Sequence, residues 1–253
     1  QRRDFSGHAF GGSIVGIVEW RPASDTAEFL MRNVRYYYNN PGDTNSFDSA
    51  MQLEGVRGNG ELISVALDAV NKTAVLEVAN VSSADADLTV RFYSAAGTLL
   101  QTTTLSLGAY ESRHIIANEI LSNGVGMATV DGSTIASSLA IGMHYSRNDT
   151  GSINYVYGVI AKESLGTVLR GSYNTFLNQG CRLQIVNTSN ATVDSLLGMT
   201  RYDGTDLFSG GGLLLRTPAN GVSTYNICLF EDINNYGVVT LQPDTPNTIF
   251  PTL

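Results

Sequence analysis

Two cysteines are the residues of this chain with the clearest potential for covalent chemistry. An internal repeat of the chain aligns Cys181 with Ala74 and Cys228 with Ala117. Both partners are small and both are replaced together, which indicates two β-carbons that face each other. We therefore predict a Cys181–Cys228 disulfide, worth about 4 kcal/mol in the chain-entropy model and typical of an oxidising compartment. The alternative is two unrelated buried thiols that pack as small apolar side chains.

Loop carboxylates are the candidates for metal binding. Two lie in one turn and two in a turn of the neighbouring copy of the repeat: Asp85, Asp87, Asp203 and Asp206. Calcium takes six or more oxygen ligands from flexible loops. Paired aspartates are also common in ordinary turns, where each carboxylate accepts hydrogen bonds from nearby backbone. Calcium is thus the one cofactor that the sequence leaves open, with plain turn chemistry as the alternative.

Aromatic side chains are the candidates for carbohydrate binding, because a flat exposed ring can stack on a sugar face. The first part of the chain contains Trp20 and a run of three tyrosines centred on Tyr37. In a strand, alternation places Tyr37 on the opposite face from its two neighbours. Trp20 and Tyr37 are therefore the candidate sugar platform, and packing in a core or between domains is the alternative.

Catalytic motifs are absent from the sequence. The three histidines, His8, His114 and His144, lie at different places in the repeat, and none has a second ligand at a metal-binding spacing. The chain contains no Gly-x-Ser-x-Gly elbow, no phosphate-binding glycine loop and no His-Glu-x-x-His motif. We therefore expect a protein that is not an enzyme.

Composition narrows the range of partners and compartments. A net charge of −8 argues against a nucleic-acid partner, which requires a basic face. No apolar run approaches the length that spans a bilayer. Only 15% of the residues are charged, and the polar residues are mainly Ser, Thr, Asn and Gly. These features favour a secreted or cell-surface protein.

The elements that position these residues repeat along the chain. Leu76–Ser82 and Leu183–Ser189 show the same alternation and the same asparagine at the fifth position. The segment Ser64–Leu76 aligns without a gap on Gly171–Leu183. Three glycines begin apolar segments at a regular spacing: Gly16, Gly126 and Gly237. The period of about 110 residues is that of a whole domain rather than of a solenoid rung.

Each copy of the repeat has the pattern of short strands. Leu88–Tyr93 alternates and turns at Ser94–Gly97, and the counterpart turn, Tyr202–Thr205, contains an Asp-Gly pair. The longest helical candidate is a turn or two around Asn118–Leu121. We therefore predict an all-β fold of tandem antiparallel β-sandwich repeats, with seven or eight strands per unit and an immunoglobulin-like topology.

The predicted repeats divide the chain into three segments. Residues 1–70 are predicted to be the second half of a unit, residues 71–170 a complete sandwich, and residues 171–253 a repeat truncated at its C-terminal end. The alternative is two sandwiches that exchange terminal strands. On either reading the sequence begins and ends part-way through its own unit.

A resemblance accompanies this pattern. The Leu-x-Val/Ile-x-Asn-x-Ser motif, the Phe92–Leu99 hairpin and the Gly237–Val239 segment resemble tandem immunoglobulin-like sandwiches of bacterial secreted and surface proteins. The resemblance is one of architecture and implies spacers, stalks, adhesins or appendage subunits.

Incomplete terminal units predict a mode of self-association. An unpaired sandwich edge exposes backbone donors and acceptors that can recruit another strand. Head-to-tail contacts of this kind do not close and give a filament. We expect an extracellular structural or adhesive element that binds copies of itself in this way. The alternatives are a segment of a longer array, a terminal strand pair that packs on its neighbour, and a glycan-binding module.

Overall fold

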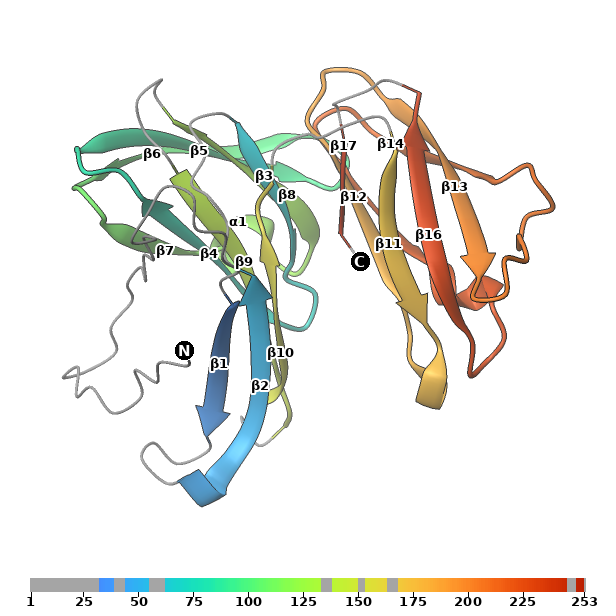
Figure 1. Ribbon diagram of the computed structural model, residues 1–253. Helices are drawn as coiled ribbons and strands as arrows, with labels where there is room; N and C mark the ends of the chain where they lie inside the picture. Colours follow the sequence, from blue (N-terminus) through green and yellow to red (C-terminus); the bar gives the residue numbers. More distant parts are fainter. Residues whose placement is uncertain are drawn as a thin grey trace, which may run out of the picture.

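The computed structural model describes residues 32–38, 44–54, 62–132, 138–149, 153–162, 168–244 and 249–252. These residues form an all-β protein in which every strand pairing is antiparallel. Two sandwich-like units lie side by side, and a hairpin extends from the first (Figure 1). The all-β antiparallel prediction is confirmed. None of the described helices is long and apolar enough to cross a membrane.

The first part of the chain contains the hairpin and unit 1. The hairpin consists of β1 (Arg32–Tyr38) and β2 (Phe47–Glu54), with the 3-10 turn η1 (Thr44–Ser46) between them. Unit 1 contains β3 (Ile63–Asp68), β4 (Thr73–Asn80), β5 (Ala86–Ser94), β6 (Leu99–Leu107), β7 (Ser112–Ile116), α1 (Asn118–Leu121), β8 (Val125–Gly132), β9 (Ser138–Arg147) and β10 (Ile153–Ile160).

Unit 2 follows and repeats this order of elements. It contains β11 (Leu169–Asn174), η2 (Phe176–Asn178), β12 (Arg182–Asn187), β13 (Val193–Arg201), β14 (Leu213–Thr217), β15 (Val222–Asn226), η3 (Ile227–Phe230), β16 (Tyr236–Pro243) and β17 (Ile249–Thr252).

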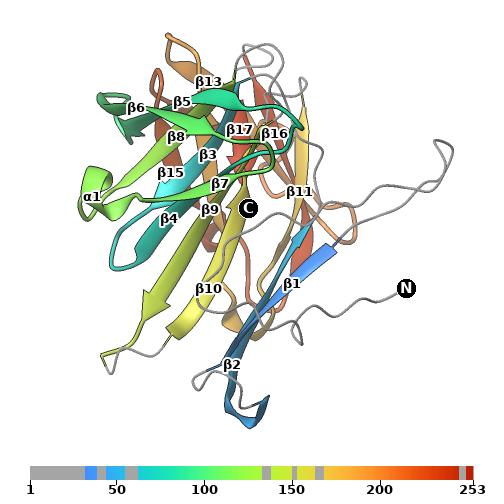
Figure 2. The same cartoon turned by 90° about the vertical axis from the view of Figure 1, so that its left-hand side faces the viewer.

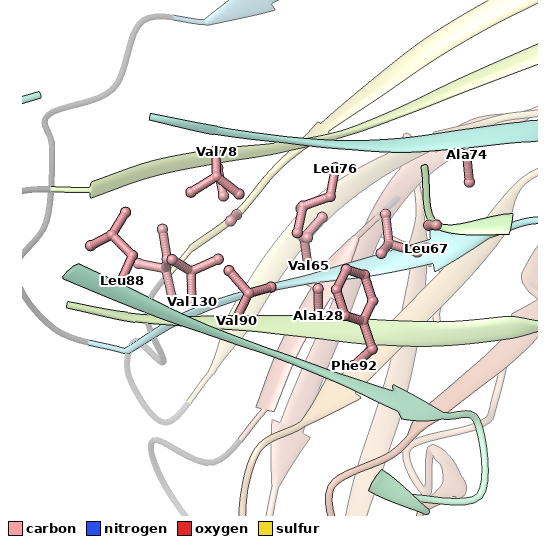
Figure 3. Packing of buried hydrophobic residues seen from close by; sticks show 14 of the residues in the cluster. Val65, Leu67, Ala74, Leu76, Val78, Leu88, Val90, Phe92, Ala128 and Val130 are labelled. Carbon is pink, nitrogen blue, oxygen red and sulfur yellow. The ribbon is translucent and has the colours of Figure 1, made fainter. Parts of the chain in front are cut away.

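Unit 1 is a sandwich of two four-stranded sheets. Sheet 1a has the order β10-β9-β4-β7 and sheet 1b the order β3-β8-β5-β6. Alternation in β4 and β5 turns one set of side chains inward, so that Leu76 of β4 faces Val90 and Phe92 of β5 across the core, with Leu88 at one end of the same cluster (Figure 3). These four side chains are fully buried, which makes this cluster the main source of the unit's stability.

Unit 2 repeats the arrangement with one strand fewer. Sheet 2b, in the order β11-β16-β13-β14, corresponds to sheet 1b, and sheet 2a, in the order β15-β12-β17, corresponds to sheet 1a without β10. Its core contains Leu183, Ile185, Leu197 and Met199. The strand orders of the two units do not confirm the immunoglobulin-like topology.

The repeated asparagine has the same function in both units. Asn80 Nδ2 donates to the carbonyl oxygens of Ala84 (2.7 Å) and Gly108 (3.0 Å). Asn187 Nδ2 donates in the same way to Ala191 (2.8 Å) and Pro218 (2.9 Å). Each asparagine therefore ties the turn after its own strand to the loop that follows β6 in unit 1 or β14 in unit 2.

Strand register corrects one part of the sequence alignment. Ile63 pairs with Val130 in unit 1, and Leu169 pairs with Leu241 in unit 2. Val130 and Leu241 lie at the same distance after the repeated glycines, so Leu169 is the counterpart of Ile63. The ungapped alignment places that counterpart one residue later and is therefore wrong over β11. The extra residue lies in the 175–178 turn, and a one-residue slip would turn every side chain of β11 to the other face.

The hairpin lies against unit 1. Figures 1 and 2 both show β2 beside β10 at the side of the first sandwich. β3, from the predicted partial repeat of residues 1–70, pairs with β8 of unit 1, while the predicted boundaries at residues 70 and 170 stay predictions.

Candidate functional site

The side of unit 2 next to β17 is the first candidate site. In unit 1 the corresponding side is closed by β10, whose Val159 joins the core together with Ala161 directly after the strand. The backbone of Lys162 then exchanges two hydrogen bonds with Ser64, of 3.0 and 3.1 Å, which link β3 of sheet 1b to the segment that follows β10. The two sheets of unit 1 are thus joined along this side.

Unit 2 has a cavity at the equivalent place. Among the described residues, β17 pairs only with β12, so its other edge has no neighbouring strand. A cavity of about 370 Å³ is lined by Leu183, Val239 and Leu241, together with residues of β2, β10 and β11. These three side chains correspond to Leu76, Ala128 and Val130, which belong to the core that β10 helps to complete in unit 1. The cavity therefore lies where the counterpart of β10 would lie, and no described strand pairs with β17 on that side.

The backbone of β17 is compatible with such a strand. In unit 1 the carbonyl oxygen of Ala140 accepts the Ala161 N–H at 2.8 Å. Pro251 of β17 pairs with Ile185, and Ala140 of β9 pairs with Val78, which is the counterpart of Ile185 in unit 1. Pro251 is therefore the counterpart of Ala140. A proline lacks an N–H but keeps its carbonyl oxygen as an acceptor. One donor is lost at this edge, and the acceptor that the counterpart uses is retained.

The β1–β2 hairpin is the second feature. Met51 and Leu53 pack with Val75 and Met143 on the outer face of sheet 1a. Because these contacts use only the apolar face of the hairpin, the backbone of its outer edges pairs with no other described strand. The hairpin therefore combines a fixed position with free sheet edges.

A salt bridge fixes the hairpin as well. Arg35 donates two hydrogen bonds of 2.9 Å to the Glu77 carboxylate on the outer face of β4. This hydrogen bonding raises the pKa of the Arg35 guanidinium above its ordinary value. The bidentate geometry holds the hairpin at one angle to sheet 1a.

A buried polar cluster lies at the junction of the two units. The Asp68 carboxylate accepts from Lys72 Nζ at 2.6 Å and from Arg182 of unit 2 at 3.1 Å. His144 Nε2 accepts the Asp68 N–H at 3.0 Å, and its ring stacks on Tyr157 at 4.4 Å. Burial lowers the pKa of His144 to about 4, so the ring is neutral near pH 7. His144 therefore has a structural position at the junction.

Apolar packing completes the junction. Ala66 and Met127 on the outer face of sheet 1b contact Val186 and Val222 on the outer face of sheet 2a. The Val222 N–H donates to the Ala95 carbonyl oxygen at 3.0 Å. The two units therefore meet face to face through sheets 1b and 2a.

The predicted disulfide is present. Cys181 and Cys228 are bonded with a Cα–Cα distance of 5.0 Å. Tyr225 of β15 pairs with Leu183, and Ile115 of β7 pairs with Leu76, the counterpart of Leu183. Tyr225 therefore corresponds to Ile115. Three residues later in each unit, Cys228 corresponds to Asn118 rather than to Ala117. In unit 1 the Asn118 side chain accepts a hydrogen bond from the N–H of Ala74, the counterpart of Cys181, and donates one to the carbonyl oxygen of Lys72, both at 2.7 Å. A side-chain hydrogen-bond pair in one unit is thus a covalent bond in the other.

The predicted metal ligands take part in turn and strand contacts. Asp85 accepts the Ala109 N–H, and Asp87 accepts the Ser106 hydroxyl. Asp203 and Asp206 accept backbone N–H groups two residues ahead of them. The part of the chain that the structure describes contains no group of three or more His, Cys, Asp or Glu residues able to hold a metal. Calcium binding by the four carboxylates stays a prediction.

The predicted sugar platform is described in part. Trp20 lies outside the described residues. Tyr37 is half-buried and packs edge-on against Tyr145 with the ring centres 6.2 Å apart. A different aromatic group, which the sequence did not reveal, lies on unit 2, where Tyr202 and Tyr236 stack at 4.9 Å. Their approach depends on sheet register, so no spacing in the sequence signals it.

Comparison with protein-family models, with curated proteins and with solved structures found no match to this chain.

Proposed function

We propose that this protein is an extracellular structural or adhesive element whose molecules join head to tail by strand addition. The observation that carries the proposal is the difference between the two sheets that the repeat makes equivalent. Sheet 1a has four strands, while sheet 2a has three described strands and a cavity where the fourth would lie. An added strand would pair with β17 and cover the apolar residues of that cavity.

The occupant of this edge is the β1–β2 hairpin of a second molecule. In the order of the chain, β1 and β2 come directly before unit 1, just as β9 and β10 come directly before unit 2. Within the repeat, β2 is therefore the counterpart of β10. Its outer edges are free of other described strands. Because the contact joins two different surfaces, an edge of the hairpin and the edge of β17, it is heterologous and builds a filament where the rotation between successive molecules does not close a ring.

Several properties accord with a role outside the cell. The disulfide favours an oxidising compartment, and the low content of charged residues suits a secreted or surface protein. Tandem sandwiches related to the immunoglobulin-like repeats of bacterial surface proteins are the architecture that we propose. The proposed role requires no catalytic centre, nucleic acid or membrane span.

A proline at the edge of sheet 2a tests the proposal. In antiparallel pairing the backbone groups of successive residues point to alternate sides of the strand. Ala140 of β9 points its backbone groups outward, toward the segment after β10, and Pro251 is its counterpart in β17. Ile249, two residues before Pro251, therefore has its N–H on the same outer side. Ile249→Pro removes that donor and inserts a ring at the edge, while pairing with β12 is kept. The matched control is Ile249→Val.

Light scattering and negative-stain micrographs of the whole chain give the readout. The wild-type protein and Ile249→Val are expected to form longer assemblies as concentration rises, whereas Ile249→Pro is expected to stop doing so. The wild-type chain showing no filaments at high concentration, or the proline variant assembling as the control does, would contradict the proposal. A glycan-binding module would instead be unassembled and would shift on a polysaccharide panel.

A further inference from the structure

The outer face of sheet 2b differs from the other three outer sheet faces because no described residue covers it. The outer face of sheet 1a carries the β1–β2 hairpin. The outer faces of sheets 1b and 2a cover each other at the junction of the units. In Figure 1, β13 and β16 of sheet 2b lie on the side of unit 2 that faces away from unit 1. Sheet 2b is therefore the one of these four sheets whose outer face is not covered by any of the residues that the structure describes.

This face carries large apolar side chains that are open to solvent. In sheet 2b and the turn after β13, five of them are between 43% and 64% exposed: Leu196, Tyr202, Leu214, Tyr236 and Val238. The rings of Tyr202 and Tyr236 stack with their planes 18° apart, which makes a continuous aromatic surface. Val238 adjoins the stacked tyrosines, and Leu196 and Leu214 form a second apolar pair beyond Gly198 and Thr240 on the same face. Exposed apolar groups gathered on one sheet face are typical of interaction sites.

The equivalent face of unit 1 shows what such a surface binds. Val238 and Tyr236 correspond to Met127 and Val125, because β16 and β8 align through their repeated glycines, Gly237 and Gly126. Met127 is fully buried at the junction, and Val125 packs against the same cluster. The face that unit 2 leaves open is thus the face through which unit 1 binds another sandwich.

The turn beside this face repeats the comparison. Tyr202 corresponds to Ala95, whose carbonyl oxygen accepts the Val222 N–H of unit 2. Gly97 in the same turn lies so close to Ala219 of unit 2 that a side chain would collide with the Ala219 carbonyl oxygen. Its counterpart Gly204 has the same backbone conformation, with φ of +87°, and no atom within 4 Å of an added Cβ. The turn of unit 2 therefore has the shape of a docking turn without its partner.

Sheet 2b is also apolar where unit 1 is polar. Leu196 and Leu214 form a cross-strand pair, and their counterparts Thr89 and Thr104 form the same pair in unit 1. Thr104 is exposed and Thr89 is half-buried, so the contact with unit 2 does not bury this pair. Leucines at these positions extend the apolar surface of sheet 2b beyond the area that the internal junction uses.

We propose that the outer face of sheet 2b binds the same face of a second copy of this chain. A sandwich face is the partner that unit 1 binds at the equivalent surface, and in each copy the face of sheet 2b is the one that no described residue covers. Two copies that pair sheet on sheet therefore meet through sheet 2b on both sides. The contact is isologous and closes as a dimer. It is independent of the strand addition proposed above, which uses the edge of sheet 2a.

The turn that carries Tyr202 is held in place before binding. Glu231 is fully buried at its side chain and accepts hydrogen bonds from Arg201 at 2.9 Å and from the Tyr173 hydroxyl at 2.8 Å. Arg201 precedes Tyr202 directly, so this network fixes the base of the turn. A preorganised surface loses less entropy on association than a mobile one.

Sedimentation of the Ile249→Pro chain tests the dimer separately from the filament, because that variant lacks the edge donor of strand addition. We expect it to be a dimer at 50 µM. Adding Tyr236→Thr and Val238→Thr, which keep strand propensity while removing apolar area, is expected to raise the dimer dissociation constant at least tenfold. Leu214→Arg places like charges across the contact and is expected to give the same result.

The control substitutes two exposed leucines of unit 1, Leu99→Thr and Leu100→Thr, which lie on β6 and outside the face. The control is expected to remain a dimer. A monomeric Ile249→Pro chain at 50 µM overturns the proposal, whether or not the face binds a polysaccharide. A dimer that persists in both the threonine and arginine variants also overturns it. Filament formation by the wild-type chain is scored separately, so failure of the dimer leaves the strand-addition proposal intact.

Discussion

The disulfide of unit 2 gives a prediction whose size follows from the structure. Cys181 and Cys228 are separated by 47 positions in the sequence. In the chain-entropy model a closed loop of this length stabilises the fold by about 4 kcal/mol. Replacing both cysteines by alanine is therefore expected to lower the free energy of unfolding of unit 2 by about that amount.

Unit 1 supplies a second variant that refines the test. There Ala74 and Asn118 occupy the two positions, and the Asn118 side chain makes two hydrogen bonds of 2.7 Å to the backbone. Each such bond contributes about 1 kcal/mol net. The variant Cys181→Ala with Cys228→Asn copies this arrangement, and we expect it to recover roughly 1 to 2 kcal/mol of the loss.

The assay is urea denaturation in which unfolding is monitored by hydrogen exchange of the amides of β12 and β15, because these two strands belong to unit 2 alone. Reduced wild-type protein should match the double-alanine variant. A double-alanine variant within about 1 kcal/mol of the oxidised wild type would refute the entropic account. An asparagine variant no more stable than the alanine variant would refute the equivalence of Cys228 and Asn118.

Three further predictions concern the repeated and junction residues. Asn187→Ala leaves buried carbonyl oxygens without donors and is expected to cost unit 2 about 2 to 4 kcal/mol, with Asn80→Ala doing the same to unit 1, as thermal unfolding and hydrogen exchange would show. The folded-state pKa of His144 is about 4 and lies below its unfolded value. The contribution of His144 to the free energy of unfolding is therefore fully present above pH 6.5 and falls by about 3 kcal/mol as the pH drops to 4. Urea titrations should show this loss in the wild type and not in His144→Gln. Gly97→Ala is expected to open the junction in small-angle scattering, whereas Gly204→Ala, with the same positive φ and an open site, bears only the backbone strain of about 1 kcal/mol; equal effects of the two substitutions would contradict the junction.

Much of the fold is predictable from sequence because strand alternation and repetition act locally. The Leu-x-Val/Ile-x-Asn-x-Ser motif marks both β4 and β12, and its asparagine makes the same hydrogen bonds in each unit. The two cysteines, which the alignment places near each other, are bonded. These features depend on residues that are close in sequence or that the repeat brings into register.

Other features depend on contacts that no local pattern encodes. The one-residue shift of β11 arises in the turn that contains Leu177 and Asn178, both at positive φ, and pairing with β16 sets it. The stacking of Tyr202 on Tyr236 joins a turn to a strand that is distant in the sequence. No pattern in the sequence therefore marks sheet 2b as a surface, whereas Trp20 and Tyr37 are candidates by residue type alone.

The strand-addition proposal is tested most directly by hydrogen exchange at two concentrations of the wild-type chain. We predict that the amides of β17 (Ile249–Thr252) and of β2 (Phe47–Glu54) exchange more slowly in the concentrated sample, while those of the core strand β4 (Thr73–Asn80) do not change. Slower exchange at both edges together would show that each one gains a hydrogen-bonded neighbour. Identical exchange of β17 and β2 at both concentrations would contradict the account.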